Sequence, residues 1–269
     1  MCPGRARKLG RVTAAHDLAE YSAIFGAGMA AGVMNTVVGS GTLLTFPTLL
    51  AFGYSPVLAN VSNTIGLVPG SFSGAYGYRS ELVGQRRRAL ILGSASVLGG
   101  ILGALLLLHL PASAFQDIVP VLIVLALVLV VLQPRVGAWA ARRREERGTA
   151  HREAGGPLLW AGVFATGVYG GYFGAAQGVL LLALMGIAFT DSLQRVNALK
   201  NILAGLVNGV AAVLFIALSH VSWSAAGLIA AGSIIGGQIG AKVGRKLPPT
   251  VLRGVIVCVG IAAIVKLLA

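Results

Sequence analysis

The chain has 269 residues, of which 56 % are hydrophobic and only 11 % are charged, and its formal net charge is +13. Soluble domains average about a quarter charged residues, so this composition excludes an ordinary soluble domain and predicts an integral membrane protein in a lipid bilayer. No nucleic-acid partner is expected, because the sequence offers no soluble domain with interleaved aromatic and basic residues.

The first part of the chain predicts a polar, basic N-terminal tail (1–19) followed by a first membrane repeat (20–133). Most of its apolar segments approach or exceed the roughly 20 residues that span a bilayer. Residues 41–53 form a shorter segment, typical of a half-helix or re-entrant piece. The predicted segments are 20–38, 41–53, 57–77, 89–109 and 112–133.

A basic linker rich in Arg and Glu (134–156), expected in the cytoplasm, precedes a second membrane repeat (157–269). The segment 177–189 has the same short length as 41–53. The predicted segments are 157–174, 177–189, 192–219, 223–244 and 249–268. The two cysteines, Cys2 and Cys258, indicate neither a disulfide framework nor a metal cluster.

The two membrane repeats resemble each other in sequence. A shift of 135 residues places Gly39 on Gly174 and Lys200 on Ile65. Farther along, "GGILGA" (99–104) lies on "GGQIGA" (236–241) at a shift of 137, which predicts a two-residue difference in the loop between the third and fourth segments. The repeat also predicts that the first apolar segment is retained as structure and is not a signal peptide.

The basic residues of the loops predict that the two repeats have opposite orientations. In the first repeat the loop after 57–77 is basic, whereas in the second repeat the corresponding loop, "SHVSW" (219–223), has no Lys or Arg. Since Lys and Arg accumulate in cytoplasmic loops, this pattern indicates an inverted repeat, as in many secondary transporters. The basic tail, Arg5 to Arg11, disagrees, because it falls outside if each repeat crosses an odd number of times.

Gly-rich turns interrupt both repeats between the first and second segments: "NTVVGSGTLL" (35–44) and "GGYFGAAQGVLL" (170–181). A non-helical turn at membrane depth requires surrounding protein or a polar cavity. The helices that restart after the turns would direct N–H groups into that cavity, and such N-termini attract anions. Alternatively, the glycines only allow helices to pack closely. The candidate binding residues here are Gly39, Ser40, Gly41, Thr42, Gly174 and Gln177.

The third segment of each repeat begins with a polar face. Ser55 is a candidate N-cap before Pro56, and Thr190 or Asp191 is the candidate cap in the second repeat. Lys200 lies about 13 Å beyond that cap along the helix axis, and ionisable residues at such depth usually face an interior cavity. The alternatives for Lys200 are snorkelling to the interface or pairing with Asp191, which is too distant along one helix. The candidate binding residues are Asn60, Asn63, Thr64, Asn197, Lys200 and Asn201.

Catalytic residues, a metal site and a cofactor are not expected. All eight acidic residues lie at segment ends or in polar stretches, which disfavours a cation pump or a carboxylate proton relay. The sequence contains no HExxH motif, no paired aspartates and no Ser–His or Ser–Lys dyad motif. His109 and His220 both fall in short loops. A donor-rich cavity with one fixed positive charge predicts a small anion as the substrate.

These motifs together resemble those of the sulfite exporter TauE/SafE family, a group of bacterial-type anion transporters. The resemblance rests on the two turns, on "ANVSNT" (59–64) and "RVNALKN" (195–201), and on the duplicated "GG..GA", and it extends over about 21–268. It implies an all-α polytopic membrane protein of about eight spans that moves sulfur-containing anions or organosulfonates across the cytoplasmic membrane. Within that family, the short turns "GSGT" and "GAAQG" are departures, because longer glycine runs are common there.

Several other functions stay open at this point. The protein could transport another small anion such as a carboxylate, or it could form a channel, which would need the same donors without alternating halves. A membrane-embedded enzyme would need a catalytic motif, and a scaffold would not need buried Asn and Lys side chains. The sequence does not indicate an oligomeric state.

Overall fold

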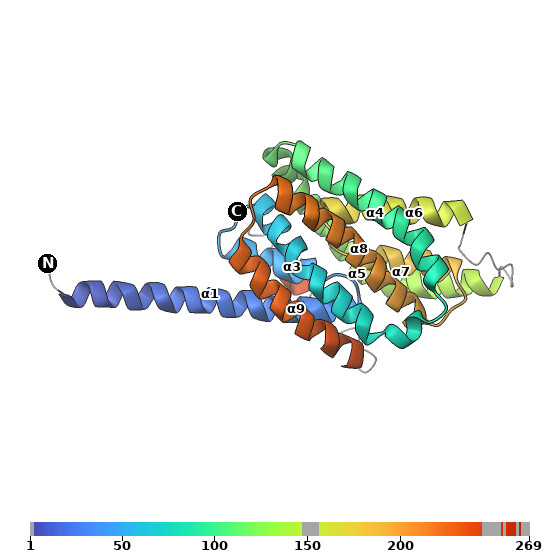
Figure 1. The fold of residues 1–269 in the computed structure, drawn as a ribbon, viewed down its shortest axis with the longest axis horizontal. Helices are drawn as coiled ribbons and strands as arrows, with labels where there is room; N and C mark the ends of the chain where they lie inside the picture. The colour runs from blue at the N-terminus through green and yellow to red at the C-terminus, as the bar shows by residue number, and fades with distance from the viewer. Residues whose placement is uncertain (1–2, 147–155, 244–253, 255–256, 262–263, 265–269) are drawn as a thin grey trace.

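The structure is a computed structural model that describes residues 3–146, 156–243, 254, 257–261 and 264. Within these residues every regular element is a helix, which confirms the predicted all-α class (Figure 1). The elements are α1 (Pro3–Val37), α2 (Thr42–Ala51), α3 (Pro56–Gly77), the 3₁₀ helix η1 (Arg79–Leu82), α4 (Arg86–His109), α5 (Ala112–Glu146), α6 (Gly156–Tyr172), α7 (Gln177–Ala188), α8 (Leu193–Leu218) and α9 (Trp223–Val243).

Four of the described helices are long and apolar enough to cross a membrane, by length and composition. These helices are α4, α5 up to Arg135, α8, and α9 up to Lys242. The resemblance had implied about eight spans. Helices α6 and α3 are not among the four. Helix α6 has only 17 residues, and α3 carries the polar side chains of Asn60 and Asn63 near its start. The predicted last segment, 249–268, lies almost entirely outside the described residues.

Two helices extend beyond their predicted bounds. Helix α1 begins at Pro3, so its first part occupies the predicted polar tail and projects from the bundle (Figure 1). This stretch is rich in Ala, Arg, Lys and Leu, which are good helix formers, so the helix continues although the residues are polar. Helix α5 likewise runs to Glu146, thirteen residues past the predicted end at 133 and well into the predicted linker.

Each outer helix pair joins a helix of one predicted repeat to a helix of the other. Helix α1 packs along α9, α6 packs along α4, and α3 and α8 pack against each other between these pairs. Glycines of the duplicated "GG..GA" stretches bring the backbones of α1 and α9, and those of α4 and α6, into close contact. A Cβ on Gly236 would lie 2.0 Å from Met29 O, and a Cβ on Gly99 would lie 2.3 Å from Phe164 O. Small residues allow such backbone approach between membrane helices, so these glycines have a packing role.

The helix bounds give the predicted repeat a different register from the one assigned in the sequence. The starts of α2 and α7, at Thr42 and Gln177, keep the shift of 135 residues. The N-caps of α3 and α8, Ser55 and Ser192, are 137 residues apart, as are the starts of α4 and α9. The two extra residues therefore lie in α7, which has 12 residues against 10 in α2. The prediction that they lie in the loop before the fourth segment was wrong, because glycines recur in packed helices and align at more than one shift.

With the corrected register, Asn60 corresponds to Asn197, and Asn63 corresponds to Lys200. Ile65, the counterpart assigned from sequence, is therefore not the counterpart of the buried lysine. The polar starts of α3 and α8 then have the same pattern. They differ at one position, where α3 carries the amide of Asn63 and α8 carries the ammonium of Lys200.

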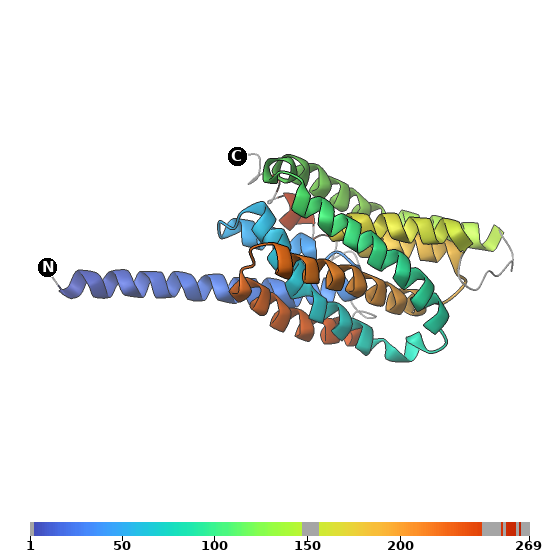
Figure 2. The same ribbon diagram turned by 45° about the horizontal axis from the view of Figure 1, so that its top comes forward.

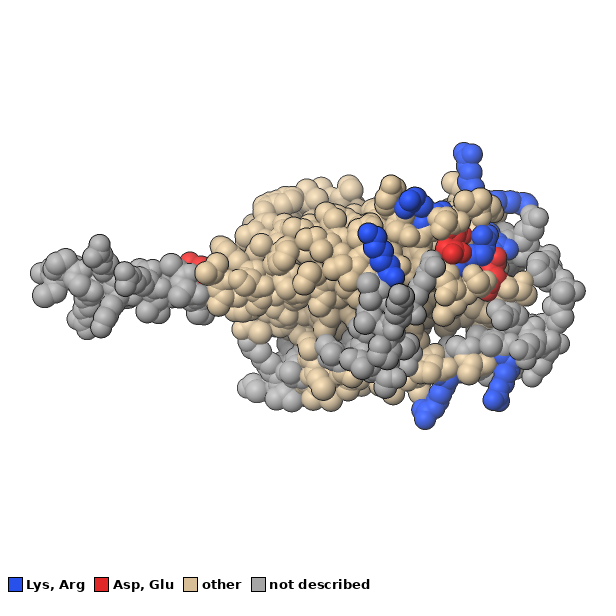
Figure 3. Space-filling view, turned by 90° about the horizontal axis from the view of Figure 1, so that it is seen from below, with Lys and Arg blue, Asp and Glu red and all other residues tan. Residues whose placement is uncertain are grey.

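Helices α3 and α8 run antiparallel through the middle of the bundle (Figure 2). The loop after α8 meets the start of α3, where Ser222 N donates a hydrogen bond to Ser62 Oγ at 3.0 Å. The loop after α3 meets the start of α8, where Gln85 Nε2 donates to Arg195 O at 3.0 Å. Charged side chains gather toward one end of a largely uncharged body, away from the projecting part of α1 (Figure 3).

Candidate functional site

The two predicted helix breaks are present, and they touch each other at the centre of the bundle. Gly39 and Gly174 have φ angles of +88° and +78°, a left-handed conformation that glycine adopts without strain. Gly178 N, in the first turn of α7, donates a hydrogen bond to Gly39 O at 3.0 Å. A Cβ on Gly39 would lie 2.4 Å from Gly178 Cα, so these backbones are in direct contact.

Lys200 is fully buried beside this contact. Its Nζ donates hydrogen bonds to the carbonyl oxygens of Asn35 at 2.7 Å and Thr36 at 3.1 Å. These carbonyls belong to the last turn of α1, where the helix break removes their usual N–H partners and leaves partial negative charge. The ammonium therefore caps the C-terminal end of α1. It neither snorkels to the interface nor pairs with Asp191.

The asparagines near the starts of α3 and α8 each cap a helix of the opposite predicted repeat. Asn197 Nδ2 donates to Thr36 O at 2.9 Å, and Asn60 Nδ2 donates to Tyr172 O at 2.9 Å. Both side chains are buried, and the Oδ1 atom of each has no partner among the described residues. The predicted Asn60 and Asn197 thus use one amide N–H for the protein itself and retain a buried acceptor.

The remaining predicted residues of the first repeat join α2 to α3. Asn63 Nδ2 donates to Thr42 Oγ1 at 3.3 Å, and its Oδ1 accepts a hydrogen bond from the Thr45 hydroxyl. Thr64, which follows Asn63, is buried. This link holds the start of α2, with Ser40 and Gly41 before it, against the polar face of α3.

A second polar cluster, which the sequence did not predict, lies at the start of α8. The Asp191 carboxylate accepts a hydrogen bond from Arg88 Nη1 and another from Arg195 Nε at 3.0 Å. Burial raises the pKa of Asp191, but the hydrogen bonds and positive charges of the two arginines outweigh it and lower the pKa overall. The Arg88 guanidinium also lies over the Phe189 ring at 4.3 Å from its centroid.

This cluster also explains why the predicted cap of α8 was wrong. The N-cap is Ser192, whose Oγ accepts a hydrogen bond from Arg195 N at 3.3 Å. Asp191, one of the two predicted caps, is occupied by the two guanidinium groups. In α3 the predicted Ser55 is the N-cap and Pro56 follows it, as expected, although Ser55 makes no side-chain capping bond.

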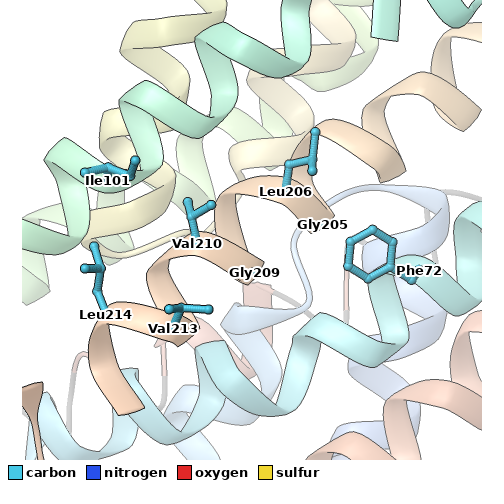
Figure 4. Close-up of a pocket in the computed structure, with 8 residues that line it drawn as sticks. All are labelled: Phe72, Ile101, Gly205, Leu206, Gly209, Val210, Val213 and Leu214. Carbon is cyan, nitrogen blue, oxygen red and sulfur yellow. The ribbon is translucent and has the colours of Figure 1, made fainter. Parts of the chain in front are cut away.

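An apolar cavity of about 350 Å³ lies between α3, α4 and α8 (Figure 4). Its walls provide neither charge nor side-chain hydrogen-bond donors, so it does not suit a small anion. The lining residues are Phe72, Ile101, Gly205, Leu206, Gly209, Val210, Val213 and Leu214.

The profile of the protein family described as "Sulfite exporter TauE/SafE" matches residues 24–267. The chain belongs to the sulfite exporter TauE/SafE family. The matched region takes in both helix breaks, Lys200 and all the predicted site residues. This membership confirms the resemblance drawn from the turns and the polar helix starts.

Curated relatives of this TauE/SafE protein carry transporter names. It is 27 % identical over 246 residues to the "Probable membrane transporter protein YfcA" of Escherichia coli (strain K12), covering 91 % of this chain and 88 % of the relative. It is 25 % identical to a "Probable membrane transporter protein" of Haemophilus influenzae, covering 87 % of this chain and 89 % of the relative. No solved structure matches the chain. The protein is therefore a multi-pass membrane transporter and not an enzyme.

Several buried hydrogen-bond donors have no partner among the described residues of this TauE/SafE transporter. They are Ser40 Oγ, Gln177 Nε2, Asn201 Nδ2 and Thr36 Oγ1, and all four side chains are at most 2 % exposed. A buried donor without an acceptor costs about 1–3 kcal/mol. Ser40, Gln177 and Asn201 directly adjoin Gly39, Gly178 and Lys200 in the chain, and the Gln177 amide packs against Gly170 at the end of α6. A bound ligand with several acceptor oxygens would satisfy them.

Proposed function

We propose that this protein is a secondary transporter that moves a small anion, a sulfur oxyanion or an organosulfonate, across the cytoplasmic membrane by alternating access. The buried Lys200 beside the crossing of the two helix breaks is the observation that carries the proposal. A fixed positive charge inside a membrane protein is costly and is typical of a substrate pathway. Here it is accompanied by neutral donors and by no buried carboxylate among the described residues.

The chemistry of the site favours an oxyanion. Lys200 supplies the charge, and its bonds to two α1 carbonyls fix the position of the ammonium. Ser40, Gln177 and Asn201 supply donors from three different elements, which suits a group whose oxygens point in several directions. The N-terminal ends of α2 and α7 add a favourable dipole for negative charge. Sulfite, sulfate and sulfonate groups all have this shape and charge.

The proposed inverted repeat would supply the motion. Different contacts lie near the two ends of the antiparallel α3 and α8. At one end Asp191 binds Arg88 and Arg195, and at the other end Tyr54 OH donates to Glu20 Oε1 at 2.9 Å. We propose that substrate enters from either side when one of these two sets of contacts opens while the other stays closed.

Flux measurements in proteoliposomes test this function. The panel comprises sulfite, thiosulfate, sulfate, sulfoacetate and taurine, with acetate and lactate as carboxylate comparisons. We expect saturable flux of at least one sulfur anion in the wild type, its loss in Lys200→Met, and its retention in Lys242→Met, where the same substitution removes an exposed lysine. Flux of carboxylates alone, or unchanged flux in Lys200→Met, would contradict the proposal.

The same proteoliposomes distinguish a carrier from a channel. Unlabelled anion on the opposite side of the membrane should accelerate the flux of labelled anion through a carrier, because the loaded site returns faster than the empty one. A channel has no returning site, so the absence of this acceleration would favour the channel alternative.

A further inference from the structure

The ends of α1 and α6 have the same backbone pattern. The N–H groups of Val38 and Gly39 both donate to Met34 O, at 2.8 and 2.9 Å. After α6 the N–H groups of 173 and 174 both donate to Tyr169 O, at 2.9 and 3.2 Å. At the shift of 135 residues that relates these ends, the Asn35 and Thr36 carbonyls correspond to those of residues 170 and 171.

These two pairs of carbonyls differ in what they bind. The carbonyls of Asn35 and Thr36 share the Lys200 ammonium. The carbonyls of Gly170 and Gly171 are in buried residues, and no described group donates a hydrogen bond to them. Asn63, the counterpart of Lys200, binds threonines of α2 instead. The end of α6 therefore carries the negative end of a helix dipole without the cation found at the end of α1.

Further oxygen atoms border the end of α6. The Asn60 amide is held against it by the hydrogen bond from Nδ2 to Tyr172 O, and its Oδ1 is fully buried without a partner. Gly174 leaves a space that a side chain would occupy. A Cβ there would lie 3.1 Å from Gly170 O and 3.9 Å from Thr42 Oγ1, so these two oxygens face the same small space.

We propose that this end of α6 binds a monovalent alkali cation, Na⁺ by preference, through the carbonyls of Gly170 and Gly171 and the side chain of Asn60, with Thr42 Oγ1 beside them. The cation would bind the α6 carbonyls as the Lys200 ammonium binds the carbonyls of α1. A site of neutral oxygens alone suits an alkali cation, whereas Ca²⁺ and Mg²⁺ sites in proteins usually include carboxylates. Unwound carbonyls and half-helix C-termini coordinate Na⁺ in other secondary transporters.

This site deepens the proposed function, on which it rests, by assigning the coupling ion. A cation bound beside the crossing of the two turns would add positive charge near the anion, so the two ligands would favour each other's binding. The unpartnered donors of Ser40 and Asn201 suit the anion, and the unpartnered Asn60 Oδ1 suits the cation.

Thermal unfolding of the purified protein in detergent tests the cation site without requiring transport. The protein is unfolded in NaCl, KCl, LiCl and N-methylglucamine chloride at equal concentration, so that chloride and ionic strength are constant. We expect Na⁺ to raise the Tm saturably above the N-methylglucamine value, and to raise it more than K⁺ does. No difference between the alkali chlorides and N-methylglucamine chloride in the wild type would overturn the site.

Asn60→Ala should raise the half-saturating Na⁺ concentration at least tenfold. Asn197→Ala is the matched control, because Asn197 makes the equivalent bond at the end of α1, where Lys200 already supplies the cation. We expect Asn197→Ala to keep the Na⁺ response. An Asn60→Ala variant with an unchanged Na⁺ response would overturn the site. If Asn60→Ala does not fold, Asn60→Asp decides, since a carboxylate at the same place must lower the half-saturating Na⁺ concentration.

Asn63→Lys adds an ammonium at the position that corresponds to Lys200. We expect this variant to lose its Na⁺ response, because the new ammonium would reach the α6 carbonyls as Lys200 reaches those of α1. A wild-type Na⁺ response in this variant would count against the site. The two proposals can fail separately: Na⁺-dependent unfolding without any anion flux would contradict only the transport function, and anion flux without a Na⁺ effect on unfolding would contradict only the cation site.

Discussion

Lys200 Nζ lies 2.7 Å from the carbonyl oxygen of Asn35, a residue 165 positions away in the chain. The lysine therefore joins the start of α8 to the end of α1 and places a charge next to the crossing of the two helix breaks. Its stem has little room, because a Cβ on Gly178 would lie only 3.1 Å from Lys200 Cδ.

This geometry predicts that Lys200→Arg fails although it keeps the charge. The planar guanidinium is larger than an ammonium and cannot place a single nitrogen between the two carbonyls without displacing Gly178. We expect anion flux in proteoliposomes to fall at least tenfold, with the protein still inserted and folded. Lys242→Arg, at an exposed lysine, is the control. Wild-type flux in Lys200→Arg would show that charge alone suffices.

The contact between Gly39 and Gly178 predicts a large effect of one methyl group. Gly39→Ala introduces a side chain at a φ of +88° and places its Cβ 2.4 Å from Gly178 Cα. We expect the free energy of unfolding to fall by about 2 kcal/mol or more, from backbone strain and overpacking together. Gly26→Ala, in α1, is the control because its Cβ would meet nothing within 4 Å. Unfolding in detergent compares the two variants, and equal stabilities would contradict the contact.

The helix breaks could be predicted from sequence because their signals are local. A short apolar segment and a glycine cluster are visible within a dozen residues, and both breaks are present, with left-handed glycines at Gly39 and Gly174. The burial of Lys200 could also be expected from the apolar residues around it. Its partners could not, because any residue can offer a backbone carbonyl and no side chain marks Asn35 or Thr36 as acceptors.

The register of the predicted repeat and one of the two ion pairs of Asp191 likewise depend on features that are not local in the sequence. The two-residue difference lies in the lengths of α2 and α7, and short apolar helices have no sharp ends in sequence. The pair of Asp191 with Arg195 spans one helical turn and is of a kind that sequence can suggest. The pair of Asp191 with Arg88 joins residues 103 positions apart and depends on the packing of α4 against α8.

Asp191 predicts a pH dependence of stability. Its pKa is lowered in the folded protein, so its contribution is present above the unfolded pKa of about 3.9 and is lost as the pH falls through the folded pKa. We expect Asp191→Asn to be less stable than the wild type at neutral pH by about 1–2 kcal/mol, a value between exposed and buried ion pairs. The difference should shrink below about pH 4 as the wild-type carboxylate is protonated.

Asp117→Asn controls for the loss of a carboxylate as such, since Asp117 is exposed on α5. Denaturant unfolding from pH 3 to pH 8 measures all three proteins. A constant difference between Asp191→Asn and the wild type across this range would mean that the ionised carboxylate does not provide the stability.

The loops at the two ends of α3 and α8 predict opposite accessibility. The connection from α3 to the first turn of α4 contains Arg79, Arg86, Arg87 and Arg88 and should face the cytoplasm, whereas the loop between α8 and α9 has no Lys or Arg and should face the other side. Single cysteines at Val83, which is 72 % exposed, and at His220 report on these loops in a background with Cys2→Ser and Cys258→Ser. In intact cells a membrane-impermeant maleimide should label His220→Cys, and it should label Val83→Cys only after permeabilisation. The reverse pattern would invert the orientation, and labelling of both in intact cells would refute the placement of these loops on opposite sides, on which alternating access depends.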